Sequence, residues 1–324
     1  MSNITEIAKR ANVSRTTVSR VLNHHPYVKH DKREAVFQAM KELHYVPNLN
    51  AINLSRGRTN VLGVIVPKIS HPFFSSLIEG IGEECHQFDY SLLVYQSNND
   101  PKKELQFFDK LKHQQIDGLI LGSSVLPTAT VDHFAQYLNV VSCENSNSNI
   151  LPRVYVNHGH GIQLAIDHLR ERGHQKMGLC IGNPQSGVGV TRRESFFHFQ
   201  ELYELNWQEE WYFSEQYTID HGREIARNLI EQKERPTAMI VGSDQVAAGL
   251  YYELANQELR IPEDLAIVGF DNQPIAQITE LTTIQQPVKE LGKKAVFLLN
   301  NLIHKQIVPL SNLFDLQLIA RKST

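Results

Sequence analysis

The chain has 324 residues, of which 41% are hydrophobic and 21% are charged, and its formal net charge is −3. This composition is typical of a soluble globular protein of two or three domains. No apolar run is long enough to span a bilayer, the first residues MSNITEIAKR do not resemble a signal peptide, and the three cysteines are too few and too scattered for a disulfide framework. We therefore expect a cytoplasmic protein without membrane contact.

The charge is distributed unevenly along the chain. Residues 1–58 contain ten Lys or Arg and four Asp or Glu, so this segment carries +6 and the remainder carries −9. A basic head on an acidic body indicates that one end of the protein binds a polyanion. Charge alone equally allows a solvated basic surface.

The first 47 residues have the spacing of three short helices. Thr5 is expected to cap the first helix and Ser14 the second. The third helix is expected over about residues 31–43, where five apolar residues recur at helical spacing: Ala35, Val36, Ala39, Met40 and Leu43. Two short helices joined by a tight turn and braced by a third indicate a helix-turn-helix domain.

The second of these helices has one apolar and one polar face. Val18, Val21 and Leu22 are spaced to pack inward. The outward face then presents Arg15, Thr16, Ser19 and Arg20, with Thr17 at its edge. Arg pairs with guanine edges and Thr contacts base edges or the thymine methyl group, so this face suits a DNA major groove.

Several motifs in this order resemble those of the lactose-repressor (LacI/GalR) family of bacterial transcription regulators. The resemblance begins with ITEIAKRANVSRTTVSRVLN (4–23) and YVPNLNAINLSRGRTNVLGVIVP (45–67). It continues through HPFF (71–74), DGLIL (117–121), HLRERGH (168–174), SDQVAAG (243–249), IPEDLAIVGFDN (261–272) and LTTIQQP (281–287). It therefore covers essentially the whole chain.

The resemblance implies a dimeric repressor of carbohydrate-utilisation genes that binds a near-palindromic operator in double-stranded DNA. Residues 1–47 would form the helix-turn-helix domain, and residues 48–59 a hinge that becomes helical on DNA. Leu54 would then wedge into the minor groove and kink the duplex. The DNA-contacting residues expected from the outward helix face and from the resemblance are Thr5, Ser14, Arg15, Thr16, Thr17, Ser19, Arg20, Asn23, Tyr27, Asn48, Ala51 and Leu54.

From about Val61 onward, short β-rich runs alternate with helical stretches. The runs are VLGVIVP, YSLLVYQ, DGLILGS, VVSCE, KMGLCIG, TAMIVGS and LAIVGFD. Such alternation predicts parallel α/β sheets. The resemblance implies a two-lobed, periplasmic-binding-protein-like core over residues 60–324, with lobe 1 over about 60–158 and 289–318 and lobe 2 over about 159–288 and 319–324. An effector would bind between the lobes, outside the carboxyl ends of the strands.

The effector site is expected to combine charged groups, which bind sugar hydroxyls, with aromatic rings, which stack on the sugar. Asp271, Arg193 and Tyr217 match effector-contacting positions of the family. The full set of expected residues is Ser70, Phe73, Phe74, Asn157, Arg193, Tyr217, Ser243 and Asp271. Phe73 and Phe74 could instead belong to the core, Arg193 to an ion pair, and Asp271 to a helix cap. Asp244 is interpreted as the cap of a helix that begins at Gln245.

Three departures from the family pattern limit this transfer. Asn12 replaces the usual Gly in the turn of the helix-turn-helix, which Asn tolerates because it adopts positive φ more readily than most residues. Asn157-His158 replaces the common Asp-Asn pair, and Phe196-Phe197 follows Arg193 in place of Gly-Phe. The effector therefore stays open between a sugar, a sugar phosphate, a purine and a phosphorylated partner protein docking on the first lobe. No leucine-heptad tail follows LIARKST, so a homodimer is expected.

No catalytic or metal-binding constellation is recognisable in the sequence. His24-His25 and the pair His158 and His160 lack Cys or carboxylate partners at ligand spacing. No nucleophile elbow is present. We therefore expect no cofactor, no metal and no enzymatic activity. A sugar-binding transport component and an α/β enzyme are the competing interpretations.

Overall fold

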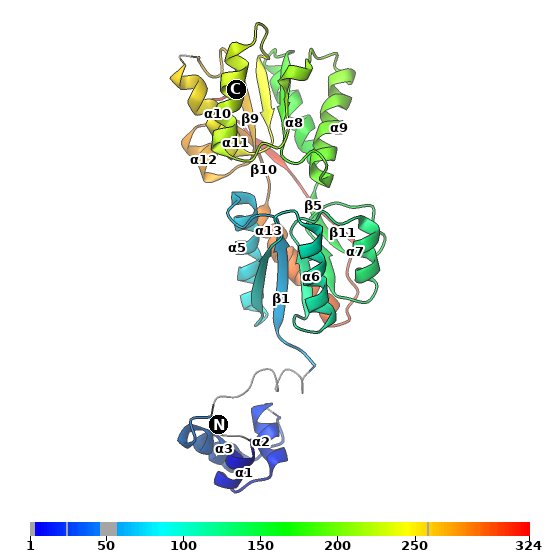
Figure 1. Ribbon diagram of the computed structural model, residues 1–324, viewed down its shortest axis with the longest axis vertical. Helices are drawn as coiled ribbons and strands as arrows, with labels where there is room; N and C mark the ends of the chain where they lie inside the picture. Colours follow the sequence, from blue (N-terminus) through cyan, green and yellow to red (C-terminus); the bar gives the residue numbers. More distant parts are fainter. Residues whose placement is uncertain (1–3, 24, 46–56, 258) are drawn as a thin grey trace. The chain divides into compact units, whose positions relative to one another are not determined.

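The computed structural model describes residues 4–23, 25–45, 57–257 and 259–324. The chain separates into two compact units, Met1–Asn60 with Gln114–Asp117, and Val61–His113 with Gly118–Thr324 (Figure 1). No helix in the described part of the chain is long and apolar enough to cross a membrane. The two units are described separately below.

The described residues of the first unit form three short helices, α1 (Ile4–Arg10), α2 (Arg15–Leu22) and α3 (His30–Glu42). They enclose a small core of buried side chains: Ile7, Ala8, Val18, Val21, Val36 and Ala39. Asn12 turns the chain between α1 and α2 with φ of 49°, the conformation expected where the family usually has Gly. The prediction that Thr5 caps α1 is wrong, because α1 already begins at Ile4 and Thr5 lies inside its first turn.

The second unit contains two six-stranded sheets. The first has the order β11-β5-β4-β3-β1-β2, and all of its neighbouring strands are parallel. Its strands are β1 (Val61–Val66), β2 (Ser91–Gln96), β3 (Gly118–Leu121), β4 (Val140–Ser142), β5 (Arg153–Val156) and β11 (Ser311–Phe314). Its helices are α5 (Pro72–Gln87), α6 (Pro101–Lys112), α7 (Thr128–Ala135) and α13 (Val288–Ile303).

The second sheet has the order β12-β10-β9-β8-β6-β7, and only the edge strand β12 is antiparallel to its neighbour. Its strands are β6 (Met177–Cys180), β7 (Tyr212–Phe213), β8 (Ala238–Val241), β9 (Ala266–Asp271), β10 (Thr282–Gln285) and β12 (Gln317–Ile319). Its helices are α8 (His158–Glu171), α9 (Gly187–Leu202), α10 (Ile219–Glu231), α11 (Asp244–Asn256) and α12 (Pro274–Ile278), with a 3-10 turn at Glu209–Trp211. The predicted α/β class with an N-terminal helix-turn-helix is confirmed.

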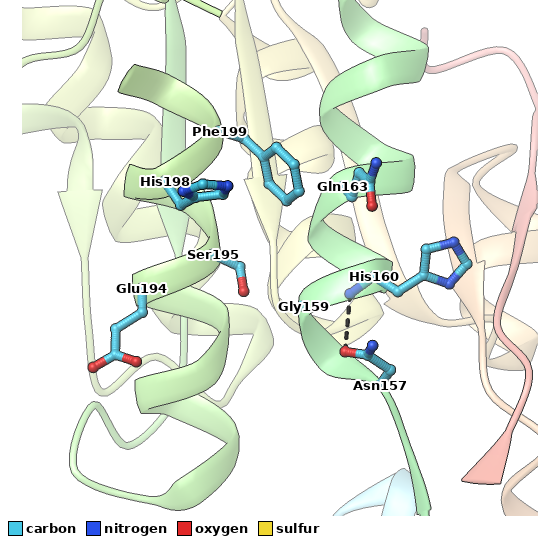
Figure 2. Close-up of a pocket in the computed structure, with 8 residues that line it drawn as sticks. All are labelled: Asn157, Gly159, His160, Gln163, Glu194, Ser195, His198 and Phe199. Carbon is cyan, nitrogen blue, oxygen red and sulfur yellow. Dashed lines mark hydrogen bonds between the residues drawn. The ribbon is translucent and has the colours of Figure 1, made fainter. Parts of the chain in front are cut away.

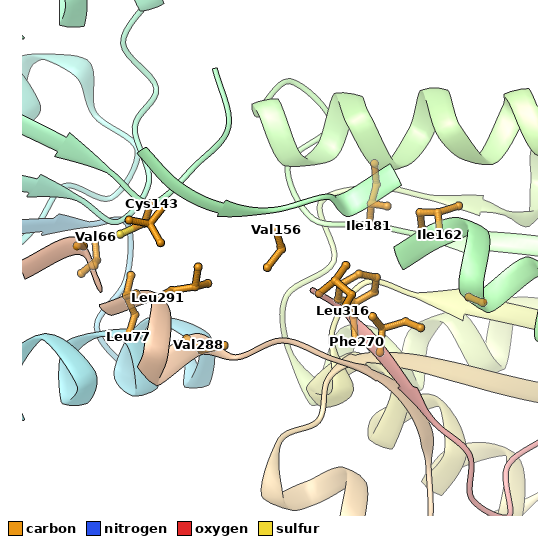
Figure 3. Close-up of a cluster of buried hydrophobic side chains, with 14 of the residues drawn as sticks. Val66, Leu77, Cys143, Val156, Ile162, Ile181, Phe270, Val288, Leu291 and Leu316 are labelled. Atoms are coloured by element: carbon orange, nitrogen blue, oxygen red, sulfur yellow. The ribbon is translucent and has the colours of Figure 1, made fainter. Parts of the chain in front are cut away.

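The connections between the two sheets decide which strand ends face each other. The chain passes from β5 directly into α8 of the second sheet, and from β10 directly into α13 of the first. It leaves both sheets at the carboxyl ends of their strands, so the carboxyl ends of each sheet face the other sheet. Val156 is the last residue of β5 and Val288 the first residue of α13. Both belong to a buried cluster with members from both sheets, including Val66 and Phe270 (Figure 3).

A close helix contact in the first lobe gives the first test. A Cβ added at Gly80 on α5 would collide with the backbone carbonyl of Lys289 on α13, whereas one at Gly82 meets nothing within 4 Å. We expect Gly80→Ala to lower the free energy of unfolding by roughly 1–3 kcal/mol, because the two backbones must separate. The matched control Gly82→Ala should raise it by about 0.5–1 kcal/mol, since Ala favours the helix. Urea unfolding followed by circular dichroism measures both, and equal effects would contradict the packing argument.

Candidate functional site

Helix α2 is oriented by a cap at one end and by buried valines on one face. Ser14 is the N-cap, and its Oγ accepts a hydrogen bond from the backbone N–H of Thr17 at 3.0 Å. Val18 and Val21 are completely or almost completely buried. Leu22 is half-buried. The side chains on the opposite face are thereby held outward.

The outward face of α2 is polar and basic. Arg15, Thr16 and Arg20 are exposed, and Ser19 is half-buried. Neither arginine forms an ion pair within the described residues, whereas Arg10 on α1 pairs with Glu42 at 2.6 Å. Two uncommitted guanidinium groups on one short helix are well suited to read base edges or bind phosphates.

The other expected DNA contacts have varied positions. Thr17 is half-buried, and its hydroxyl lies 2.9 Å from that of Ser14, so both hydroxyls help to start α2. Asn23 ends the helix, its backbone N–H donating to the carbonyl of Ser19 at 3.0 Å. Tyr27, between α2 and α3, is 89% exposed. The remaining three, Asn48, Ala51 and Leu54, lie outside the described residues.

In the second lobe, Asp271 stands at the carboxyl end of β9 with φ of 102°, a conformation that a non-glycine residue rarely adopts. Two amide side chains hold its carboxylate. Gln273 Nε2 donates to Oδ2 at 2.9 Å, and Gln286 Nε2 donates to Oδ1 at 2.5 Å. Burial raises the pKa of Asp271 to about 6. A strained and hydrogen-bonded carboxyl at a strand end is well placed to bind a ligand.

The arginine beside Asp271 is Arg192. It is 6% exposed, and its guanidinium lies 3.8 Å from the centre of the Phe270 ring. Nη1 donates to the carbonyl of Gly242 at 2.8 Å, and Nη2 lies 3.3 Å from Nδ1 of His158. Burial lowers the pKa of Arg192 to about 10, while the charge of Asp271 opposes this shift.

The expected residue Arg193 points elsewhere. It is half-buried, and its charge lowers the pKa of Tyr212 against the larger, opposite effect of burial. The structure therefore brings Arg192, the neighbour of the expected residue, close to Asp271, and an effector contact by Arg193 stays a prediction. Arg192 and Phe196 are both buried and lie four residues apart on α9, so the helical spacing from Phe196 was the signal that could have identified Arg192.

The first lobe contributes the segment between β1 and α5. Ser70 is exposed, while Phe73 and Phe74 are half-buried, meet edge-to-face at 5.1 Å and pack against the core. His71 precedes them and was not singled out from the sequence. Burial, with smaller contributions from the nearby charges of Lys68 and Arg192, lowers the pKa of His71 to about 4.

Another residue missed by the sequence reasoning is Glu144, two residues beyond β4. Its carboxylate accepts hydrogen bonds from the Ser123 hydroxyl at 2.7 Å and from the Ser124 backbone N–H at 3.3 Å. Burial raises the pKa of Glu144 to about 7. An acid that directly follows the buried run VVSC was the available signal.

Ser243 and Asp244 have structural roles at the start of α11. Ser243 is the N-cap, with its Oγ accepting from the backbone N–H of Gln245 at 3.3 Å. The prediction that Asp244 caps this helix is wrong. Asp244 is fully buried and accepts at 2.7 Å from both the Gln273 backbone N–H and the Thr283 hydroxyl. Tyr217 is 39% exposed and lies against Gly182, just beyond β6.

Asn157 directly follows β5 and starts α8. It caps α8 by accepting from the backbone N–H of His160 at 3.1 Å. It also lines an open groove of about 480 Å³ between α8 and α9, where Ser195 and Phe199 lie opposite Gln163 (Figure 2). Among the lining residues of this groove, Asn157 is the only one that the sequence had placed in the effector site. Within the described residues, no group of three or more His, Cys, Asp or Glu side chains could hold a metal ion.

Two family models match the chain. Residues 3–48 match the bacterial regulatory proteins of the lacI family, and residues 166–324 match the periplasmic binding protein-like domain. Among curated proteins, the NTD biosynthesis operon regulator NtdR of Bacillus subtilis is 38% identical, with both chains covered completely. The transcriptional repressor PurR of Klebsiella pneumoniae is 30% identical over 94% of this chain and 92% of the relative.

Solved structures show the same relationship. The lac repressor dimer bound to operator and the anti-inducer ONPF has a TM-score of 0.88 at 25% identity, covering 99% of this chain and 98% of that chain. A LacI family regulator from Lactobacillus casei with bound sucrose has a TM-score of 0.75 at 28% identity, covering 82% of this chain and 99% of that chain. The basic helix-turn-helix, the two α/β sheets and these relatives lead to one conclusion: the chain belongs to the LacI family of DNA-binding transcription regulators.

Proposed function

We propose that the protein is a homodimeric repressor of carbohydrate-utilisation genes, controlled by a small polyhydroxylated effector that binds between the carboxyl ends of its two sheets. The observation that carries the effector half of this proposal is the arrangement of Arg192 and Asp271 beside Phe270 at those strand ends. A carboxylate, a guanidinium and an aromatic face are the groups that recognise a sugar.

The DNA half is supported by the uncommitted outward face of α2. Its two exposed arginines and its threonine can contact bases once α2 enters a major groove. The family relationship adds the operator as a near-palindromic site read by two copies. The wedge role of Leu54 and the hinge over residues 48–59 stay predictions from the resemblance.

Coupling between effector and operator would follow from lobe movement. An effector that bridges the two lobes favours one inter-lobe arrangement, which changes how the first lobes of a dimer hold the two hinges. Effector and DNA then influence each other equally, with a coupling free energy of typically about 1–3 kcal/mol. Ile278 on α12, 83% exposed, and Tyr252 on α11, 58% exposed, supply apolar surface for contact with a second copy.

A thermal-shift screen of the purified protein tests the proposal. The panel contains sugars, sugar phosphates, nucleobases and nucleosides. A ligand at about 100 times its dissociation constant adds about 2.7 kcal/mol to stability, which is easily detected. Stabilisation by a sugar supports the proposal. Stabilisation by a nucleobase identifies a purine-responsive regulator, and silence across the panel favours a phosphorylated protein as the co-regulator.

The first prediction concerns Arg20. Using duplexes selected from a random pool, we expect Arg20→Ala to weaken binding to the selected site by roughly 1–3 kcal/mol and to leave binding to scrambled DNA nearly unchanged, because Arg20 reads a base edge. Lys41→Ala, which removes the same charge from the exposed side of α3, is the control and should cost far less. Equal losses on selected and scrambled DNA would make Arg20 a phosphate contact instead.

The second prediction concerns Asp271. We expect Asp271→Asn to abolish stabilisation by the effector that the screen identifies, because the carboxylate accepts its hydroxyl donors, and to leave operator affinity unchanged. Arg193→Ala is the comparison and should keep the effector response, since Arg193 contacts Tyr212. Thermal shift and operator titration on both variants measure this. A response retained in Asp271→Asn would remove Asp271 from the site.

The third prediction concerns pH. Burial raises the pKa of Asp271 to about 6, so its carboxyl is largely protonated at pH 5 and ionised at pH 7.5. Since the effector donates hydrogen bonds to the ionised form, its affinity should be about tenfold lower at pH 5 than at pH 7.5. Asp244 and Arg192 also act on this carboxyl, and the Arg192 charge favours the ionised form. Calorimetry measures the affinity, with circular dichroism checking the fold, and a flat profile would contradict the prediction.

A further inference from the structure

A carboxyl pair at the carboxyl end of the first sheet has no cationic partner among the residues that the structure describes. Glu144 follows β4, and Glu104 on α6 reaches the same loop, where Glu104 Oε2 accepts from the Ser124 hydroxyl at 2.6 Å. Ser124 also donates its backbone N–H to Glu144, so one serine contacts both acids. Glu104 is fully buried, and its charge disfavours ionisation of Glu144.

Two other acids of the second unit show the usual arrangement, in which a carboxylate is paired with a cation. Glu253 is held by Arg223 at 2.9 Å and by Arg227 at 2.8 Å, and Glu83 is held by Lys293 at 2.7 Å. Among the described residues, no Lys, Arg or His is recorded as acting on Glu104 or Glu144. A carboxylate taken out of water without an opposite charge is costly, so this position is electrostatically unsatisfied.

The facing side of the second lobe also holds an acceptor atom that lacks a donor. Gln286 is 6% exposed and donates its amide N–H to Asp271, and its Oε1 has no hydrogen-bond partner among the described residues. The pKa of Asp271 is raised by burial although Arg192 lies near, and the carboxylates of Asp244 and Asp271 are close enough to repel each other. Both lobes therefore offer acceptors at the strand ends that face each other.

We infer that the effector carries a protonated amine, as an amino sugar does, and that Glu144 is the residue that selects for this group. This inference rests on the proposed effector site and names its ligand class. Glu144 is half-buried and held by Ser123 and Ser124, so its carboxylate is already oriented for an ammonium group. An ammonium has three donors and no acceptor, which matches a site rich in acceptors. The sugar hydroxyls then bind Asp271 and Arg192 across the gap.

Matched sugar pairs test the inference on the full-length protein. Calorimetry and thermal shift compare D-glucosamine with D-glucose and N-acetyl-D-glucosamine, and D-galactosamine with D-galactose and its N-acetyl form. We expect one aminated sugar to bind at least about tenfold more tightly than its neutral counterparts, because a hydrogen bond between two charged groups is stronger than one between a carboxylate and a neutral hydroxyl or amide. N-acetylation keeps most of the shape and removes the charge, so it isolates the ammonium group.

Variants assign the preference to Glu144. Glu144→Gln keeps an acceptor for Ser123 and should remove the preference for the amine, whereas Glu144→Asp keeps the charge and should restore most of it. Glu201→Gln, an exposed acid on α9, is the matched control and should bind like the parent protein. Retention of the amine preference in Glu144→Gln would overturn the role of Glu144.

The outcomes separate this inference from the proposed function. Binding of a neutral sugar as tightly as its aminated partner would overturn the inference and leave a sugar-controlled regulator intact. Binding of the aminated sugars alone would support both. Absence of binding by every member of the panel would count against both proposals.

Discussion

The arrangement of the second unit depends on where the chain passes between its two sheets. Both sheets are built of parallel strands, and β5 and β10 each run out of one sheet directly into a helix of the other. Parallel strands place their carboxyl ends at one edge, so these passages turn the carboxyl edges of both sheets toward each other. The residues that follow strands in both lobes, among them Glu144 and Asp271, are brought to one gap by this constraint.

The second lobe contains a buried cation, Arg192, whose charged form is disfavoured by its burial. Arg192 keeps its guanidinium away from water, and its pKa is lowered to about 10 by burial although Asp271 lies near. A buried charge is tolerated only with close partners, which are here the Gly242 carbonyl, His158 and the Phe270 ring. The same partners keep the group rigid, so that a ligand meets it already oriented.

The two functional faces of the protein are built on different principles. Helix α2 presents Arg15 and Arg20, which form no ion pair with any described residue, and its orientation comes from the Ser14 cap and two buried valines. The strand-end site presents side chains that are held by one another, as the two glutamines hold Asp271. The first face is suited to a repetitive polyanion and the second to one small molecule of defined shape.

The elements with strong local signals could be predicted from the amino-acid pattern. Spacing located α1 to α3 with small boundary errors, because a helix shows its apolar face every three or four residues. Seven β-rich runs identified seven strands, whereas the interior strands β5 and β10 and the short edge strands β7, β11 and β12 were not among them. Asp271 at the end of β9 was also recognisable. Three features could be read only from the folded chain. Arg192 rather than Arg193 lies beside Asp271. Asn157 lines the groove between α8 and α9, and Ser124 bonds both Glu104 and Glu144. These facts depend on the rotation of a helix about its axis and on contacts between distant segments, which a linear pattern does not encode.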